Sequence, residues 1–187
     1  MRLHEYQSKE LIRRYGILTP YGKIANTPGE VYDIACEIGA SVVVKAQVLT
    51  GGRGKAGGIK IAGFPEEAKE YASKILGMNI KGFTVENVLV EEAIESSKEY
   101  YLGITIDRSQ QSIVVMACNE GGVDIEEVAI KAPSRIAKMW TTPKDGFLPW
   151  QGRTLALVAE FEKDILPQVG EYFVFLFRLF VEEDAEL

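Results

Sequence analysis

Five glycines occur between Gly51 and Gly58, and two cations, Arg53 and Lys55, lie among them. A run of β-branched residues that ends in Lys45 precedes this loop, and a second such run follows it. Glycine lets a backbone approach a bulky anion closely, and the cations supply charge that holds the anion. The combination is typical of a phosphate-binding loop, although a long hairpin turn also uses many glycines.

The flanks of this loop exclude two common phosphate-binding motifs. Gly52–Gly57 fits G-x-G-x-x-G, but the segment Ile59–Gly63 is too β-branched and too short for the helix that a dinucleotide fingerprint requires. The Walker pattern fails because Ala56 follows Lys55 and position 49 is leucine. Strand, glycine loop and strand instead predict a β-hairpin lid over a nucleoside triphosphate.

Acidic residues follow the next predicted strand. Glu91 and Glu92 stand at its end, and Glu99 comes eight residues after Glu91. A strand end can offer backbone groups to the edge of an adenine, and a nearby carboxylate can accept hydrogen bonds from ribose hydroxyls. Paired glutamates at a strand end are more often solvated surface, so the phosphate loop upstream is what favours a nucleoside site.

The composition is that of a globular protein. The 187 residues are 47% hydrophobic and 26% charged, and the net charge is −6. An acidic chain argues against a general nucleic-acid or anionic-membrane binder. Cys36 and Cys118 have no metal-ligand spacing and are interpreted as reduced thiols, and the first residues contain no apolar signal segment. We therefore expect a cytoplasmic protein that binds neither nucleic acid nor membrane.

Hydrophobic periodicity predicts the elements that position these residues. Helices are expected over 6–15, over 28–38 after a Thr27 cap, over 65–76 and over 152–160. Strands are expected over 41–46, 87–91, 99–106 and 112–117, with a turn at 107–110. The order predicts an α+β fold with two lobes. A last helix, 166–180, has an apolar face that we expect either this fold or further chain to cover.

Seven collinear motifs make the chain resemble the β subunit of succinyl-CoA synthetase (succinate–CoA ligase), in its N-terminal ATP-grasp domain. The motifs are Leu3–Gln7, Val44–Gln47, Gly51–Gly58, Lys98–Gly103, Asp107–Arg108, Glu120–Glu126 and Gln151–Arg153.

This resemblance implies an ATP-grasp fold of two lobes with a glycine-rich β-hairpin lid, incomplete at the C-terminus. Residues 1–20 and 104–187 would form part of the larger lobe, and residues 21–103 the smaller lobe with the glycine loop. The CoA-ligase C-terminal domain of the family would be absent.

The resemblance also implies roles for single residues. Lys45 would contact the nucleotide phosphates, and Gly52, Arg53 and Gly54 would form the loop above them. Glu91 and Ile94 would lie at the adenine side, and Glu99 would bind the ribose. These seven residues are the predicted cofactor-binding set.

The implied reaction reversibly forms succinyl-CoA from succinate, CoA and ATP or GTP, a step of the tricarboxylic acid cycle. It passes through a phosphohistidine on the partner α subunit, in an αβ or α2β2 complex. We therefore expect no catalytic residue in this chain, and the single histidine, His4, is not the phosphorylated one. Succinate and CoA would bind mainly outside this chain.

Two departures from the family stand out. Leu49 replaces a histidine that the family usually has before the loop, which leaves the choice between ATP and GTP open. The family's Mg²⁺ ligands lie beyond the position of Leu187, so we expect no metal ligand here and a chain that is catalytically incomplete by itself. The alternatives are a non-catalytic, shortened ATP-grasp nucleotide-binding module, or the same domain of malate–CoA ligase or citryl-CoA synthetase.

Overall fold

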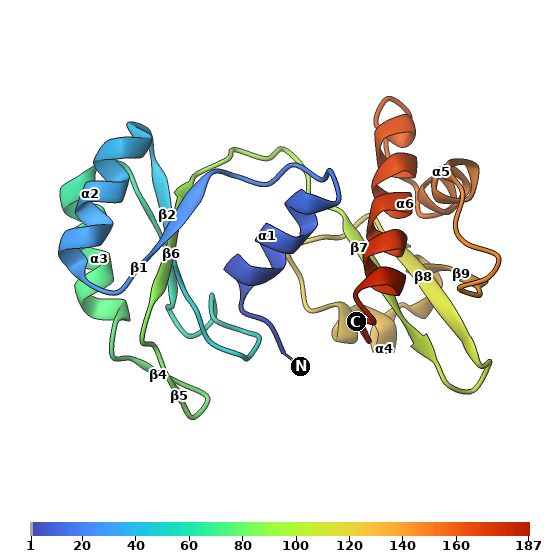
Figure 1. Ribbon diagram of the computed structural model, residues 1–187, viewed down its shortest axis with the longest axis horizontal. Helices are drawn as coiled ribbons and strands as arrows, with labels where there is room; N and C mark the ends of the chain where they lie inside the picture. The colour runs from blue at the N-terminus through green and yellow to red at the C-terminus, as the bar shows by residue number, and fades with distance from the viewer. Residues whose placement is uncertain (1) are drawn as a thin grey trace. The chain divides into compact units, whose positions relative to one another are not determined.

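The computed structural model describes residues 2–187, which divide into two compact units (Figure 1). The first unit contains residues 2–14 and 18–95, and the second contains residues 15–17 and 96–187. Both mix helices with antiparallel sheets, which confirms the predicted α+β class. No helix in this described part of the chain is long and apolar enough to cross a membrane.

A four-stranded antiparallel sheet forms the centre of the first unit. Its strands follow the order β1 (Gly22–Ala25), β6 (Val88–Glu92), β2 (Val42–Ala46) and β3 (Ile59–Ala62). Strands β2 and β3 pair directly, so the predicted hairpin around the glycine loop is confirmed. Strand β1 was not predicted, and it joins the sheet beside β6, which lies more than sixty residues later in the chain.

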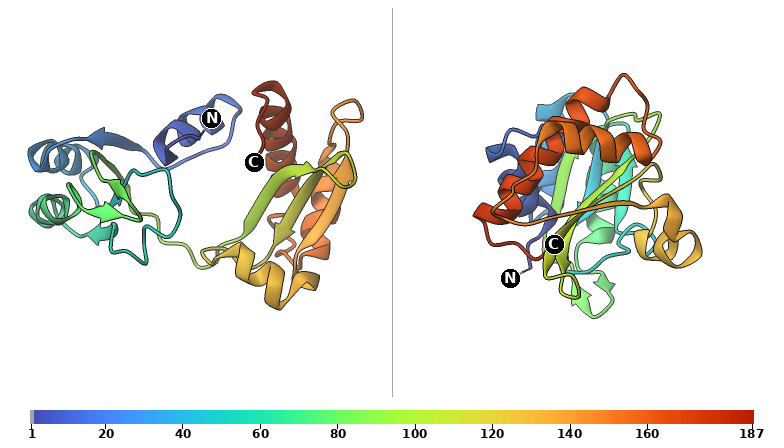
Figure 2. Two further views of the ribbon diagram at one scale, coloured as in Figure 1. Left: turned by 90° about the horizontal axis from the view of Figure 1, so that it is seen from below. Right: turned by 90° about the vertical axis from the view of Figure 1, so that its right-hand side faces the viewer.

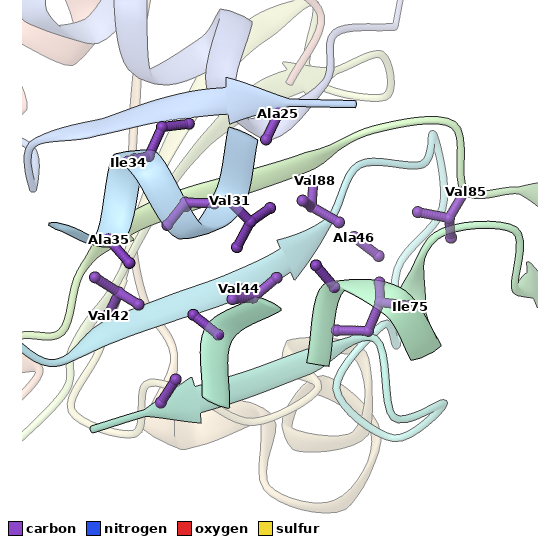
Figure 3. Packing of buried hydrophobic residues seen from close by; sticks show 14 of the residues in the cluster. Ala25, Val31, Ile34, Ala35, Val42, Val44, Ala46, Ile75, Val85 and Val88 are labelled. Atoms are coloured by element: carbon purple, nitrogen blue, oxygen red, sulfur yellow. The ribbon is translucent and has the colours of Figure 1, made fainter. Parts of the chain in front are cut away.

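Two helices cover one face of this sheet and bury its core (Figure 3). They are α2 (Pro28–Ile38) and α3 (Pro65–Ile75). Val42 and Val44 point from β2 toward Val31 of α2 and Ile75 of α3, and all four side chains are almost fully buried. Burying each such side chain stabilises the fold by about 1.5–3 kcal/mol. The alternation of β2 leaves Lys45 on the opposite face.

Local signals set the ends of α2 as expected. The hydroxyl of Thr27 accepts a hydrogen bond from the N–H of Glu30 at 3.2 Å. The carboxylate of Glu30 accepts from the N–H of Asn26, one residue earlier than in a standard capping box. Gly39 ends the helix with φ +67°, a left-handed conformation that favours glycine.

Helix α1 (Glu5–Arg14) lies against the other face of the same sheet (Figure 1). The backbone N–H of Tyr6 donates to Gln47 at 3.3 Å, and Glu5 and Lys9 make ion pairs with residues of the sheet unit. These contacts explain a difference from the expected lobes, which grouped residues 1–20 with 104–187. The compact units also divide at residues 95 and 96 rather than at 103 and 104.

A small ribbon extends the first unit next to the glycine loop. It pairs β4 (Asn79–Ile80) with β5 (Phe83–Thr84) through Lys81 and Gly82. Both turn residues have positive φ, +53° and +89°, which is the geometry of a type I′ hairpin turn.

The second unit is built on a three-stranded sheet of β7 (Tyr101–Asp107), β8 (Ser112–Cys118) and β9 (Ala137–Thr141). The predicted turn between β7 and β8 is confirmed, because Asp107 accepts hydrogen bonds from the N–H groups of Ser109 and Gln110. Strand β9 was not predicted. The same is true of α4 (Ile125–Lys131), which is followed by the 3₁₀ turn η1 (Pro133–Arg135) and packs near Cys118.

Helices α5 (Pro149–Val158) and α6 (Leu166–Glu182) cover one face of this sheet (Figure 2). They cross closely at two glycines, since a Cβ on Gly152 would lie 3.0 Å from the Cα of Gly170. Phe173 of α6 is fully buried in the resulting core. The apolar face of α6 is therefore covered by its own unit, which is the first of the two expected possibilities.

Candidate functional site

Lys45 and Glu91 meet on the sheet face that α1 covers. In the pairing of β2 with β6, Lys45 lies opposite Leu89 and Val43 lies opposite Glu91. The amino group of Lys45 donates to the Glu91 carboxylate, and Glu91 is only 2% exposed. Glu91 is therefore not a solvated residue, as glutamates at a strand end often are, because the sheet and α1 enclose it.

Helix α1 adds two charged groups to this pair. Lys9 Nζ lies 2.5 Å from Glu91 Oε2 and 3.1 Å from Glu5 Oε1, and Lys45 Nζ lies 3.3 Å from the same Glu5 oxygen. Neither residue was predicted from the sequence to belong to the site. Glu5 and Lys9 are spaced four apart, but this pattern is common on exposed helix surfaces and gave no specific signal.

The glycine loop reaches the same place through Arg53. One guanidinium nitrogen lies 2.7 Å from Glu5 Oε2, and the other donates to the carbonyl of Ala46 at 2.9 Å. Five residues thus share one network, which we call the Lys45 cluster. Its members are Glu5, Lys9, Lys45, Arg53 and Glu91. Three cations face two carboxylates, so the cluster carries a net charge of +1.

The charges of the cluster reinforce each other's ionised forms. Burial alone would raise the pKa of Glu5, but the nearby Lys45, Lys9 and Arg53 lower it to about 2. Burial alone would lower the pKa of Lys45, but its hydrogen bond to Glu91 and the charge of Glu5 raise it above its ordinary value. Both groups are therefore charged at neutral pH.

The loop itself holds a tight turn that depends on glycine. Gly52 has φ +79°, and the N–H of Gly58 donates to the carbonyl of Arg53 at 2.8 Å. A Cβ on Gly58 would lie 2.8 Å from Ile80 Cδ1, so no larger residue fits without a shift of its neighbours. Within the described chain the N–H groups of Gly52, Arg53 and Gly54 donate to no protein acceptor. Successive N–H groups of this kind can bind an anion.

A further cation stands beside the loop. Lys81, in the turn between β4 and β5, places its Nζ 3.1 Å from the position of a Cβ on Gly52. Sequence analysis missed it, because only the tertiary fold brings the β4–β5 turn to the loop.

A cavity lies next to the Lys45 cluster on the same sheet face. Its volume is about 370 Å³, within the range of small-molecule sites. Ile24 and Leu89 contribute apolar surface, while Tyr6, Lys9 and Glu91 contribute polar groups. The cluster and the cavity together combine cations with apolar surface.

The remaining predicted residues are placed differently. Ile94 belongs to the first unit and is 63% exposed. Glu99 is exposed and belongs to the second unit, where its carbonyl accepts a hydrogen bond from the N–H of Gly121. The structure therefore brings together Lys45, Arg53 and Glu91 within one unit, and it leaves the role of Glu99 a prediction.

Residues 2–187 contain no group of three or more His, Cys, Asp or Glu side chains placed to hold a metal ion. Mg²⁺ needs oxygen ligands in near-octahedral geometry. The described residues do not supply such a set.

Comparison with known sequences gives consistent matches over the whole chain. The ATP-grasp domain family matches residues 2–187 of this chain. The β subunit of the GDP-forming succinate–CoA ligase of Thermus thermophilus is 50% identical over 187 residues, which are 100% of this chain and 49% of that protein. The β subunit of the ADP-forming ligase of Roseiflexus sp. is 50% identical over 188 residues, 100% of this chain and 50% of that protein. The chain spans about half the length of these curated relatives.

Solved structures resemble this chain in fold. The dinucleotide-forming acetyl-coenzyme A synthetase 1 of Ca. Korarchaeum cryptofilum has a TM-score of 0.78 at 18% identity, over 97% of this chain and 81% of that chain. The ATP citrate lyase of Methanothrix soehngenii has a TM-score of 0.72 at 22% identity, over 96% of this chain and 44% of that chain. At such low identities the similarity concerns the fold alone.

Proposed function

Because this chain belongs to the ATP-grasp domain family, we propose that it is the nucleotide-binding part of the β subunit of a succinate–CoA ligase. The observation that carries the proposal is the Lys45 cluster beside the glycine hairpin. It joins a strand lysine, a loop arginine and unused backbone N–H groups on one face of a sheet. The similarity to ligase β subunits over the full chain supports the choice of reaction.

In the proposed reaction, the terminal phosphoryl group of ATP or GTP passes to a histidine of a partner α subunit and leaves a nucleoside diphosphate. Succinate then takes the phosphoryl group, and the thiol of CoA attacks succinyl phosphate and releases phosphate. Phosphoryl transfer depends on positioning and on neutralising charge. We assign the holding of the nucleotide to this chain, and the acyl and CoA steps to the parts of the relatives that it does not cover.

Lys45 and Arg53 neutralise the nucleotide phosphates in this proposal. Both side chains lie at the base of the glycine loop, and each is already oriented by a carboxylate. Gly52 and Gly54 donate their N–H groups to phosphate oxygens, which strengthens the site in the same way as an anion-binding backbone nest.

In this proposal Glu91 and Ile94 lie on the adenine side of the ligand, and Glu99 binds its ribose. The carboxylate of Glu91 is engaged with Lys45 and Lys9, so its side chain acts by holding Lys45 in place. Ile94 and Glu99 are exposed and available to a base and a ribose. We also propose that the protein works in the cytoplasm, since Cys36 and Cys118 are unpaired, as is usual in a reducing compartment.

The proposal is tested by nucleotide binding and by phosphoryl transfer. Isothermal titration with Mg·ATP and Mg·GTP is expected to give binding, and the ratio of the two affinities identifies the preferred nucleotide. A folded chain, shown by circular dichroism, that binds neither nucleotide would refute the proposal.

The partner is tested by adding a succinate–CoA ligase α subunit. Co-purification of the two chains, and nucleotide-dependent labelling of an α-subunit histidine by [γ-³²P]ATP, would support a working ligase subunit. Nucleotide binding without any complex would favour the alternative of a non-catalytic nucleotide-binding module.

A further inference from the structure

The Glu5 carboxylate lies among the three cations of the Lys45 cluster. Its two oxygens divide between the cations, with Oε1 near Lys45 and Lys9 and Oε2 near Arg53. A bidentate anion between an ammonium and a guanidinium has the charge arrangement of a bound phosphate.

Glu5 is also the more replaceable of the two carboxylates. Glu91 is 3% exposed in its side chain and is held by Lys9 and Lys45, whereas the side chain of Glu5 is 19% exposed. Glu5 sits in the first turn of α1, and α1 keeps two other attachments to the sheet unit, the Lys9–Glu91 pair and the hydrogen bond from Tyr6 to Gln47. Loss of the Glu5 contacts would therefore leave the helix attached.

We propose that Glu5 is a built-in counter-anion that occupies the phosphate subsite. Only a ligand with several negative charges displaces Glu5 from Lys45 and Arg53. The inference rests on the proposed function, and it adds an affinity- and specificity-determining residue to it. Glu5 keeps its charge at every physiological pH, because its pKa is held near 2. An adenosine without phosphates does not compete with Glu5, whereas ADP and ATP must displace it.

The first test compares ligands that differ only in phosphate content. We expect Glu5→Gln to bind ATP about fivefold more tightly than the wild type. An ion pair that is partly exposed to water competes only modestly with the ligand, so its removal should change the affinity by less than about tenfold. The affinity of the variant for inorganic tripolyphosphate should rise by a similar factor. The affinity for adenosine, measured by competition against a fluorescent ATP analogue, should change less than twofold.

Glu70→Gln is the matched control. It removes one carboxylate from the same unit, where Glu70 pairs with the exposed Lys74 on α3. Its ATP affinity should stay at the wild-type value. Equal or weaker ATP binding by the folded Glu5→Gln variant would overturn the inference, and so would an equal gain for adenosine.

The second test uses the wild-type chain, so it does not depend on a variant folding. Hydrogen exchange with saturating ATP should slow in the loop 51–58 and quicken in the first turn of α1, because Glu5 has left its partners. Slower exchange in both segments would overturn the inference and leave the proposed function intact. Failure of both ATP and tripolyphosphate to bind the wild type would overturn the proposed function as well.

Discussion

Substitution of Glu91 by glutamine removes one of the two carboxylates that Lys45 and Lys9 share, with little change of shape. Glu91 is 2% exposed, and the side chains of Lys45 and Lys9 are 20% and 18% exposed. After the substitution, three cations face only Glu5, so the net charge of the Lys45 cluster rises from +1 to +2.

Breaking a buried ion pair by removing one partner costs about 3–5 kcal/mol, whereas an exposed pair is worth about 0–1 kcal/mol. Both lysines keep some contact with water, so we expect Glu91→Gln to lower the free energy of unfolding of the first unit by about 2–3 kcal/mol. The exposed control Glu70→Gln should lower it by less than about 0.5 kcal/mol.

Hydrogen exchange of the β2 and β6 amides is the suitable assay, because these amides report the stability of the first unit by itself. The expected loss accelerates the slowest of these amides by about 30- to 150-fold. A double substitution, Lys45→Met with Glu91→Leu, keeps the cluster charge at +1 and should recover most of the loss. Exchange of Glu91→Gln within twofold of the wild type would refute the reasoning.

Three further predictions concern the same site. Lys45→Ala should weaken ATP binding in calorimetry more than tenfold, or about 1.4 kcal/mol, while Lys74→Ala should not, and an unchanged affinity would contradict the role of Lys45. Gly58→Ala should destabilise the first unit by about 1–3 kcal/mol in the exchange assay, whereas Gly51→Ala, with open space at its Cβ, should not. The pKa of Glu5 falls from 4.5 to about 2 on folding, so its stabilisation is present above pH 4.5 and is lost as pH falls toward 2. Thermal melts at pH 6, 4 and 3 should show that the melting temperature of the wild type falls more than that of Glu5→Gln. Equal falls in the two proteins would contradict this role of Glu5.

The elements with strong local signals could be predicted from the sequence. The glycine run between two β-branched runs predicted the β2–β3 hairpin. Thr27 and Gly39 predicted the two ends of α2. The resemblance to succinate–CoA ligase β subunits is confirmed by curated relatives at about 50% identity. Such features depend on residues close together in the chain, whose conformational preferences act before any tertiary contact forms.

Elements with weak local signals were missed. Strand β1 has only four residues, and its place beside β6 is decided by a pairing across more than sixty residues of chain. The sequence shows the apolar face of helix α6, but it does not show that the sheet and α5 cover this face.

The sequence by itself predicted the kind of chemistry, since a glycine loop with Lys45 and Arg53 beside it is a pattern typical of phosphate binding. Only the tertiary structure decided which groups hold those cations. Residues 5, 45, 53 and 91 meet because α1 lies on the sheet face opposite the core, and β6 lies next to β2. A charge pattern in a sequence gives the sign of each group, but the distance and the burial that set the strength of an ion pair come from packing.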